Sequence, residues 1–71
     1  MEKQDLINRL KRIGGIITKQ QRNEIVYKCC ISAGTLRNYL NGEVGHQAIA
    51  EKILNVWDSI VLKENFNNDD K

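Results

Sequence analysis

The stretch TKQQRNEIVYKCCISAGTLRNYLNG, residues 18–42, holds the signals that decide how this chain folds. At its start, Thr18 and Gln21 have the spacing of a capping box. In that motif the Thr hydroxyl accepts a hydrogen bond from the amide three residues on, and the Gln side chain reaches back to the Thr amide. The pattern predicts a helix that begins at Thr18 and runs to Cys30 and Ile31.

The second half of the same stretch predicts a short helix. Ser32 offers an N-cap oxygen, and Asn41 with Gly42 suits the left-handed backbone that commonly ends a helix. We therefore expect a helix over 33–40, joined to the preceding helix by a tight turn. The apolar positions expected to be buried in this region are Ile25, Val26, Cys29, Ile31, Leu36 and Tyr39.

One further helix is expected on either side of this stretch. Residues 3–13 carry apolar side chains at i, i+1, i+4 and i+7, and Gly14 with Gly15 then ends the helix. After Gly45, residues 46–64 contain no helix breaker and carry apolar residues at helical spacing, so we expect one long helix there.

Length and composition bound the architecture. Seventy-one residues are enough for one domain with a single modest core. We expect an all-α, compact four-helix domain over 1–64 with a long C-terminal helix, followed by a polar, frayed tail at 65–71. No apolar run approaches the roughly 20 residues of a membrane span, and the first residues carry charges of both signs, unlike a secretory signal. A cytoplasmic location is therefore expected.

Basic residues are concentrated in the first half of the chain. Residues 1–37 hold eight bases and three acids, and residues 38–71 hold three bases and six acids, although the net charge is only +2. A basic half can face phosphates, and it can equally be a solvated surface without a partner.

The short helix is expected to leave one side pointing outward. Leu36 and Tyr39 fall on its inner side, and the outer side is left to four other residues: Ala33, Gly34, Arg37 and Asn38. Residues 31–42, ISAGTLRNYLNG, resemble the turn, recognition helix and closing Asn-Gly of the phage-repressor-like helix-turn-helix family, also called Cro-like or XRE-like. The resemblance covers about residues 18–42.

This resemblance has three departures. One is that Ala33 and Gly34 can offer only apolar contact or close approach, which leaves base reading largely to Arg37 and Asn38. The other two concern Cys30 and Val26. The family usually has Gly where this chain has Cys30, so a positive φ there would strain the backbone. It usually has Ala where this chain has Val26, so the two helices are expected to sit further apart.

The resemblance implies a small, repressor-like transcriptional regulator that binds double-stranded DNA sequence-specifically. Ala33, Gly34, Arg37 and Asn38 would face the bases, with Arg37 suited to guanine and Asn38 to adenine. Basic side chains and polar groups near helix N-termini would contact phosphates. The phosphate candidates are Lys11, Arg12, Lys19, Gln20, Gln21, Arg22, Lys28, Ser32 and Thr35.

The long C-terminal helix carries two apolar stripes. The first is expected to pack on the helix-turn-helix and consists of Ile49, Ile53, Val56 and Ile60. The second would be exposed unless a partner covers it, and consists of Ala50, Leu54, Trp57 and Val61. We therefore expect a homodimer through the second stripe, with recognition helices about 34 Å apart on a palindromic site. The alternative is that Trp57 folds back onto the single core.

Two other classes of function are alternatives to DNA binding. A protein-binding adaptor would use the apolar face of the long helix, and Arg37→Ala would leave its partner bound. An enzyme has no support, because paired carboxylates, a nucleophile with a base and a glycine-rich phosphate loop are missing from the sequence. Cys29 and Cys30 are adjacent, which disfavours a disulfide, and have no further ligands at metal spacing. No catalytic residue, metal, cofactor, membrane or small-molecule substrate is expected, and at least one of the two thiols should be buried.

Overall fold

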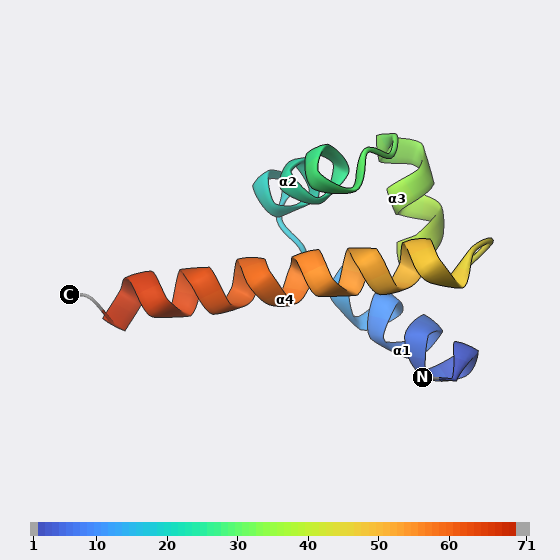
Figure 1. Cartoon of the computed structure of the whole chain (residues 1–71), viewed down its shortest axis with the longest axis horizontal. Helices are drawn as coiled ribbons and strands as arrows, with labels where there is room; N and C mark the ends of the chain where they lie inside the picture. Colours follow the sequence, from blue (N-terminus) through green and yellow to red (C-terminus); the bar gives the residue numbers. More distant parts are fainter. Residues whose placement is uncertain (1, 70–71) are drawn as a thin grey trace.

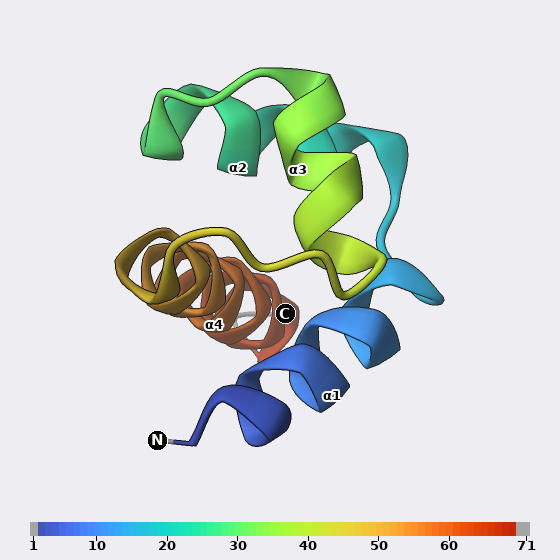
Figure 2. The same ribbon diagram turned by 90° about the vertical axis from the view of Figure 1, so that its right-hand side faces the viewer.

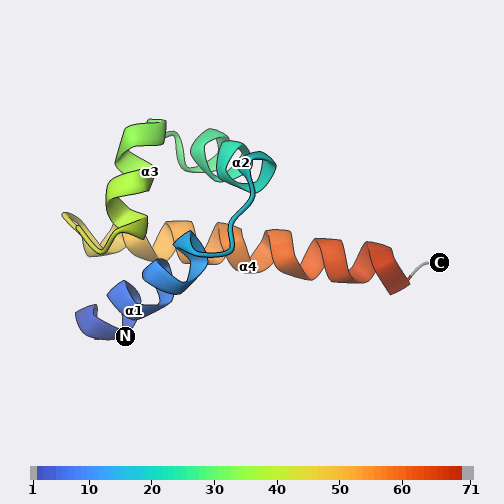
Figure 3. The same ribbon diagram turned by 180° about the vertical axis from the view of Figure 1, so that it is seen from behind.

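The computed structural model describes the backbone of residues 2–69 and the side chains of residues 2–64. That part of the chain is all-α and has no strand; its helices are α1 (Lys3–Gly14), α2 (Lys19–Cys29), α3 (Ala33–Leu40) and α4 (Gln47–Asp69). α4 runs along the longest dimension of the molecule, about 40 Å, with α2 and α3 on one side and α1 on the other (Figure 1 and Figure 3). The predicted four-helix, all-α architecture is confirmed.

Local capping groups set the beginnings of α2 and α3. The Thr18 hydroxyl accepts from the Gln21 N–H at 3.1 Å, and the Gln21 side-chain oxygen accepts from the Thr18 N–H at 2.9 Å, so the predicted capping box is present. The Ser32 hydroxyl oxygen accepts from the Thr35 N–H at 3.0 Å. Each of these bonds satisfies a backbone donor that a helix start leaves without an intrahelical partner.

All four helices contribute to one core. α1 packs against α3 and α4, and α2 packs against α3 and α4. Five large side chains, at least one from every helix, are fully enclosed: Leu6, Leu10, Ile25, Leu36 and Ile53. Cys29, at 6% exposure, also belongs to this core, so the expected buried thiol is confirmed.

The second apolar stripe of α4 is not an exposed face. Ala50 and Leu54 are buried within the chain, at 0% and 3% exposure, and Trp57 and Val61 are half-buried. The expected dimer surface is therefore wrong for Ala50 and Leu54. The reason is that α4 has neighbours on two sides, since α2 packs on it from one side and α1 from another.

α4 is longer than expected. Its backbone continues to Asp69, where the sequence suggested a frayed tail from residue 65 onward. Residues 70 and 71 of that tail lie outside the described part of the chain. Among the helices that the structure describes, none combines the length and the apolar character that crossing a membrane requires.

Candidate functional site

A left-handed turn joins α2 to α3. Cys30 has φ 56° and ψ 44°, and it is the one non-glycine residue with positive φ in the described chain. Its backbone N–H donates to the Val26 carbonyl, which caps the C-terminus of α2. Cys30 therefore has the positive φ on which the expected strain depended, and a β-carbon in this conformation costs about 1–2 kcal/mol. The turn lets α3 leave at a steep angle to α2 (Figure 2).

This turn holds α3 with one side in the core and one side in solvent. Its inner side chains Leu36, Tyr39 and Leu40 are buried. The Tyr39 hydroxyl accepts from the His46 N–H at 2.9 Å, which ties α3 to the start of α4. The four side chains predicted to face outward are all exposed: Ala33, Gly34, Arg37 and Asn38.

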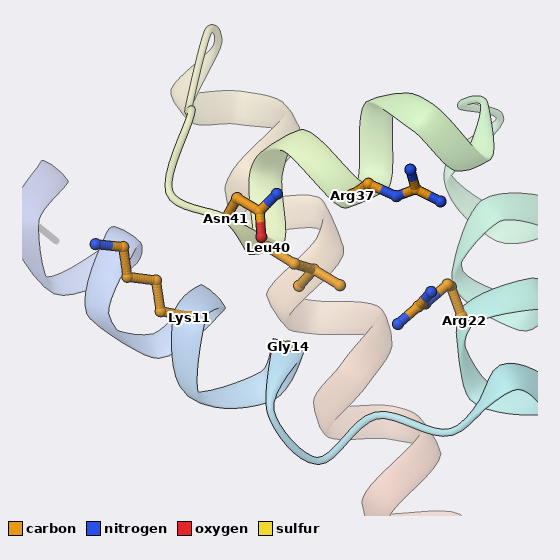
Figure 4. Close-up of a pocket in the computed structure, with 6 residues that line it drawn as sticks. All are labelled: Lys11, Gly14, Arg22, Arg37, Leu40 and Asn41. Atoms are coloured by element: carbon orange, nitrogen blue, oxygen red, sulfur yellow. The ribbon is translucent and has the colours of Figure 1, made fainter.

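A cleft of about 330 Å³ opens between α1, α2 and α3 (Figure 4). Three basic side chains line it, one from each helix, and they are the predicted site residues Lys11, Arg22 and Arg37. Arg22 and Arg37 lie on one side of Leu40, and Lys11 and Asn41 lie on the other (Figure 4). The remaining lining residue is Gly14, and no carboxylate is among the described residues that form the cleft.

Arg22 contains the one buried side-chain nitrogen or oxygen without a hydrogen-bond partner in the described chain. This atom is Nε of its guanidinium group. An unsatisfied buried donor costs about 1–3 kcal/mol, and more when the group is charged. Nε of Arg22 is therefore a buried donor on a positively charged group, and the described residues supply no acceptor for it.

The other predicted phosphate residues are not gathered in this cleft. Lys19 and Gln20 are exposed in the first turn of α2. Lys28 forms an ion pair with Glu24 at 3.2 Å. Arg12 lines a separate groove beside Trp57, between α1 and α4.

Three of the predicted polar contacts are already engaged inside the chain. The Gln21 amide bonds to Thr18 and also donates to the Glu64 carboxylate at 3.2 Å. The Ser32 hydroxyl donates to the Thr35 hydroxyl oxygen at 2.9 Å. These side chains hold the starts of α2 and α3 in shape, and their availability to a phosphate is lower than the sequence suggested.

Asn41 also lines the cleft, although its sequence context predicts only that it ends α3. Its spacing was the missed signal, because residues four apart on a helix share a face and Arg37 lies four residues earlier. Asn38 faces a different groove, which it lines together with Glu43 and Gly45. The two polar side chains of the outer face of α3 therefore point to different surroundings.

Burial raises the pKa of the Cys29 thiol above its usual value, and the nearby Lys52 ammonium only partly opposes this. Cys29 is therefore a neutral, apolar member of the core at physiological pH. Within the described residues, no group of three or more His, Cys, Asp or Glu side chains is placed to hold a metal ion.

The geometry of the chain is the basis for assigning a function, because comparisons with protein-family models, with curated protein sequences and with solved structures find no match.

Proposed function

We propose that this chain binds double-stranded DNA through the outer side of α3, as a small helix-turn-helix transcriptional regulator of the repressor type. The single observation that carries the proposal is the placement of α3, with Leu36 and Tyr39 in the core and Arg37 and Asn38 in solvent. A helix with its side chains is about 10–12 Å across, and the major groove of B-DNA is about 12 Å wide. The small side chains of Ala33 and Gly34 permit close approach to the base edges.

Asn38 is the base reader in this proposal. Its amide is exposed and carries both a donor and an acceptor, the combination that pairs with the N6 and N7 positions of adenine. The basic side chains around α3 supply contacts to phosphates, which fix register and add affinity for any sequence.

Salt dependence tests this function. With about three phosphate contacts, affinity for random duplex DNA should fall about 40-fold between 50 and 200 mM salt. Fluorescence anisotropy with a labelled duplex measures this fall, and selection from a random pool then identifies the preferred site. Asn38→Ala should weaken binding to the selected site about tenfold and leave random-duplex affinity unchanged. A flat salt response without an enriched motif would favour the adaptor function instead.

A homodimer is the second part of the proposal. The half-buried Trp57 lies beside Ile16, which is 64% exposed, in a groove between α1 and α4, and Val61 is half-buried one turn further along α4. A second copy that covers these apolar side chains would place two copies of α3 on a palindromic site. A protein partner on the same surface is what the adaptor alternative would require.

Sedimentation equilibrium tests the dimer. Wild-type protein should show about twice the 8.2 kDa mass of one chain. Val61→Glu should shift it toward the monomer, because the new carboxylate would have to be buried at the interface. Tyr27→Glu is the matched control, since Tyr27 is 82% exposed on α2 and does not line the groove that contains Trp57. A monomeric wild type, or equal effects of the two variants, would contradict this surface.

A further inference from the structure

The cleft between α1, α2 and α3 brings three positive charges together, and none of the described residues that line it is acidic. Lys11, Arg22 and Arg37 line it, whereas the carboxylates of Glu24 and Asp58 form their ion pairs with bases outside the cleft, Lys28 and Arg9. Like charges that share a small space repel one another unless an anion joins them. The arrangement therefore favours an anionic ligand.

The guanidinium group of Arg22 indicates which class of anion the cleft would bind. Nε of Arg22 is buried and has no partner within the described chain, and Arg37 extends from α3 on the same side of Leu40 (Figure 4). A guanidinium group is planar, with its N–H donors in a fixed fork that matches the oxygens of a phosphate group. Two such groups at one end of the cleft suit a tetrahedral anion with several acceptor oxygens.

The cleft is fixed by close packing of the backbone. A β-carbon at Gly14 would lie 3.2 Å from the Leu40 carbonyl oxygen, so α1 and α3 nearly touch at the cleft floor. Gly42 has φ +98°, and a β-carbon there would lie 2.7 Å from Cε of Lys11. The two glycines thus let α1 and the Lys11 stem lie against the end of α3, and these close contacts hold the walls of the cleft in place. Such pre-organisation lowers the entropic cost of binding.

From these observations we infer that the cleft binds one phosphate group. Arg22 and Arg37 hold this group at one end of the cleft, and Lys11 and Asn41 lie at the other end of the cleft. Taking DNA as the source of that phosphate rests on the proposed function. Arg37 is then a ligand for the DNA backbone and does not read guanine, and Asn38 is left as the reader of bases. The chemistry is equally that of a free phosphate compound, so the test separates the two sources.

The first measurement is binding of random duplex DNA by the full chain. Arg22→Met keeps an unbranched stem, and Arg37→Gln keeps a polar side chain, while each removes one guanidinium. Each variant should bind about tenfold more weakly than wild type. The double variant should lose less than the product of the two single effects, because both side chains hold the same phosphate. Lys52→Gln, which removes an exposed charge on α4, should change affinity less than about twofold.

The second measurement follows the Nε–Hε resonance of Arg22 during titration with inorganic phosphate at constant ionic strength. The resonance should shift and saturate in wild type, and Arg37→Gln should abolish saturation. The wild-type titration uses no variant, so its saturation reports on the cleft even if Arg37→Gln is poorly folded.

The outcomes separate the two proposals. Loss of affinity only for the selected site in Arg37→Gln, with random-duplex affinity unchanged, overturns the inference and leaves DNA binding intact. Wild-type protein that binds no duplex but shows the saturable phosphate shift overturns DNA binding and assigns the cleft to a free phosphate compound. The Arg22 resonance could instead shift linearly with phosphate concentration and be unaffected by Arg37→Gln. If the effects of the two arginine variants on DNA affinity also multiply, the cleft is not a phosphate site.

Discussion

Leu36→Ala should lower the free energy of unfolding by about 2–5 kcal/mol, the cost of removing a fully buried leucine side chain. Leu36 has 0% exposure and lies on the inner side of α3. A chain of this length has a total stability on the order of 4–11 kcal/mol, so the variant should lose a large part of it. Urea unfolding followed by far-UV circular dichroism measures the loss.

Leu62→Ala is the matched control, because it makes the same chemical change at a leucine that is 71% exposed on α4. It should change the free energy of unfolding by less than about 0.5 kcal/mol. Equal losses for the two variants would mean that α3 is not held against the core as the fold requires.

Gly14→Val should destabilise the chain by about 3 kcal/mol, because it forces α1 away from α3. A β-carbon at Gly14 would already lie 3.2 Å from the Leu40 carbonyl oxygen and 3.3 Å from the Leu40 β-carbon. The branched methyl groups of valine have no space beyond that contact. Thermal unfolding and urea unfolding both report the change.

Gly14→Ala separates crowding from helix propensity. Alanine is favoured over glycine in a helix by about 1 kcal/mol, which offsets the tight contact of a single methyl group. We therefore expect a net change within about 1 kcal/mol of zero for this variant. A Gly14→Val protein as stable as wild type would show that α1 and α3 can move apart at this contact with little loss of stability.

The sequence predicts the elements of this fold well because their signals are local. Thr18 and Ser32 cap their helices through atoms three residues away, and such contacts form whatever the rest of the chain does. A positive φ at Cys30 could be anticipated from the resemblance to the helix-turn-helix pattern, which usually has Gly at that position. These features fix where α2 ends and α3 begins.

Local sequence signals do not predict how many helices pack against α4. Periodicity shows that Leu54 and Ile53 lie on different faces of one helix, but the number of neighbours that cover those faces is a property of the folded chain. Here α1 covers one side and α2 covers another, so both residues are buried. Only Trp57 and Val61 of the predicted dimer stripe keep partly exposed surface.

The cleft was predictable only in part. Lys11, Arg22 and Arg37 were each identified as basic site residues, but they lie on three helices and are far apart in sequence. Their grouping depends on the close approach of α1 to α3 at Gly14, which no periodicity reports. The proposed roles of Arg37 in phosphate binding and of Asn38 in base reading likewise depend on the directions of the two side chains, which the sequence does not give.

The two hydrogen bonds of the Gln21 side chain link segments that are far apart in sequence, the start of α2 and the later part of α4. The Gln21 amide oxygen accepts from the Thr18 N–H, and its amide nitrogen donates to the Glu64 carboxylate. Two hydrogen bonds in series therefore connect a negative charge on α4 to the N-cap of α2. Hydrogen bonds in series polarise one another, and the carboxylate makes the amide oxygen a stronger acceptor. A molecule that binds the C-terminal turns of α4 and moves Glu64 would break its hydrogen bond with Gln21. The Thr18–Gln21 hydrogen bond would then weaken, and the first turn of α2 would be less stable.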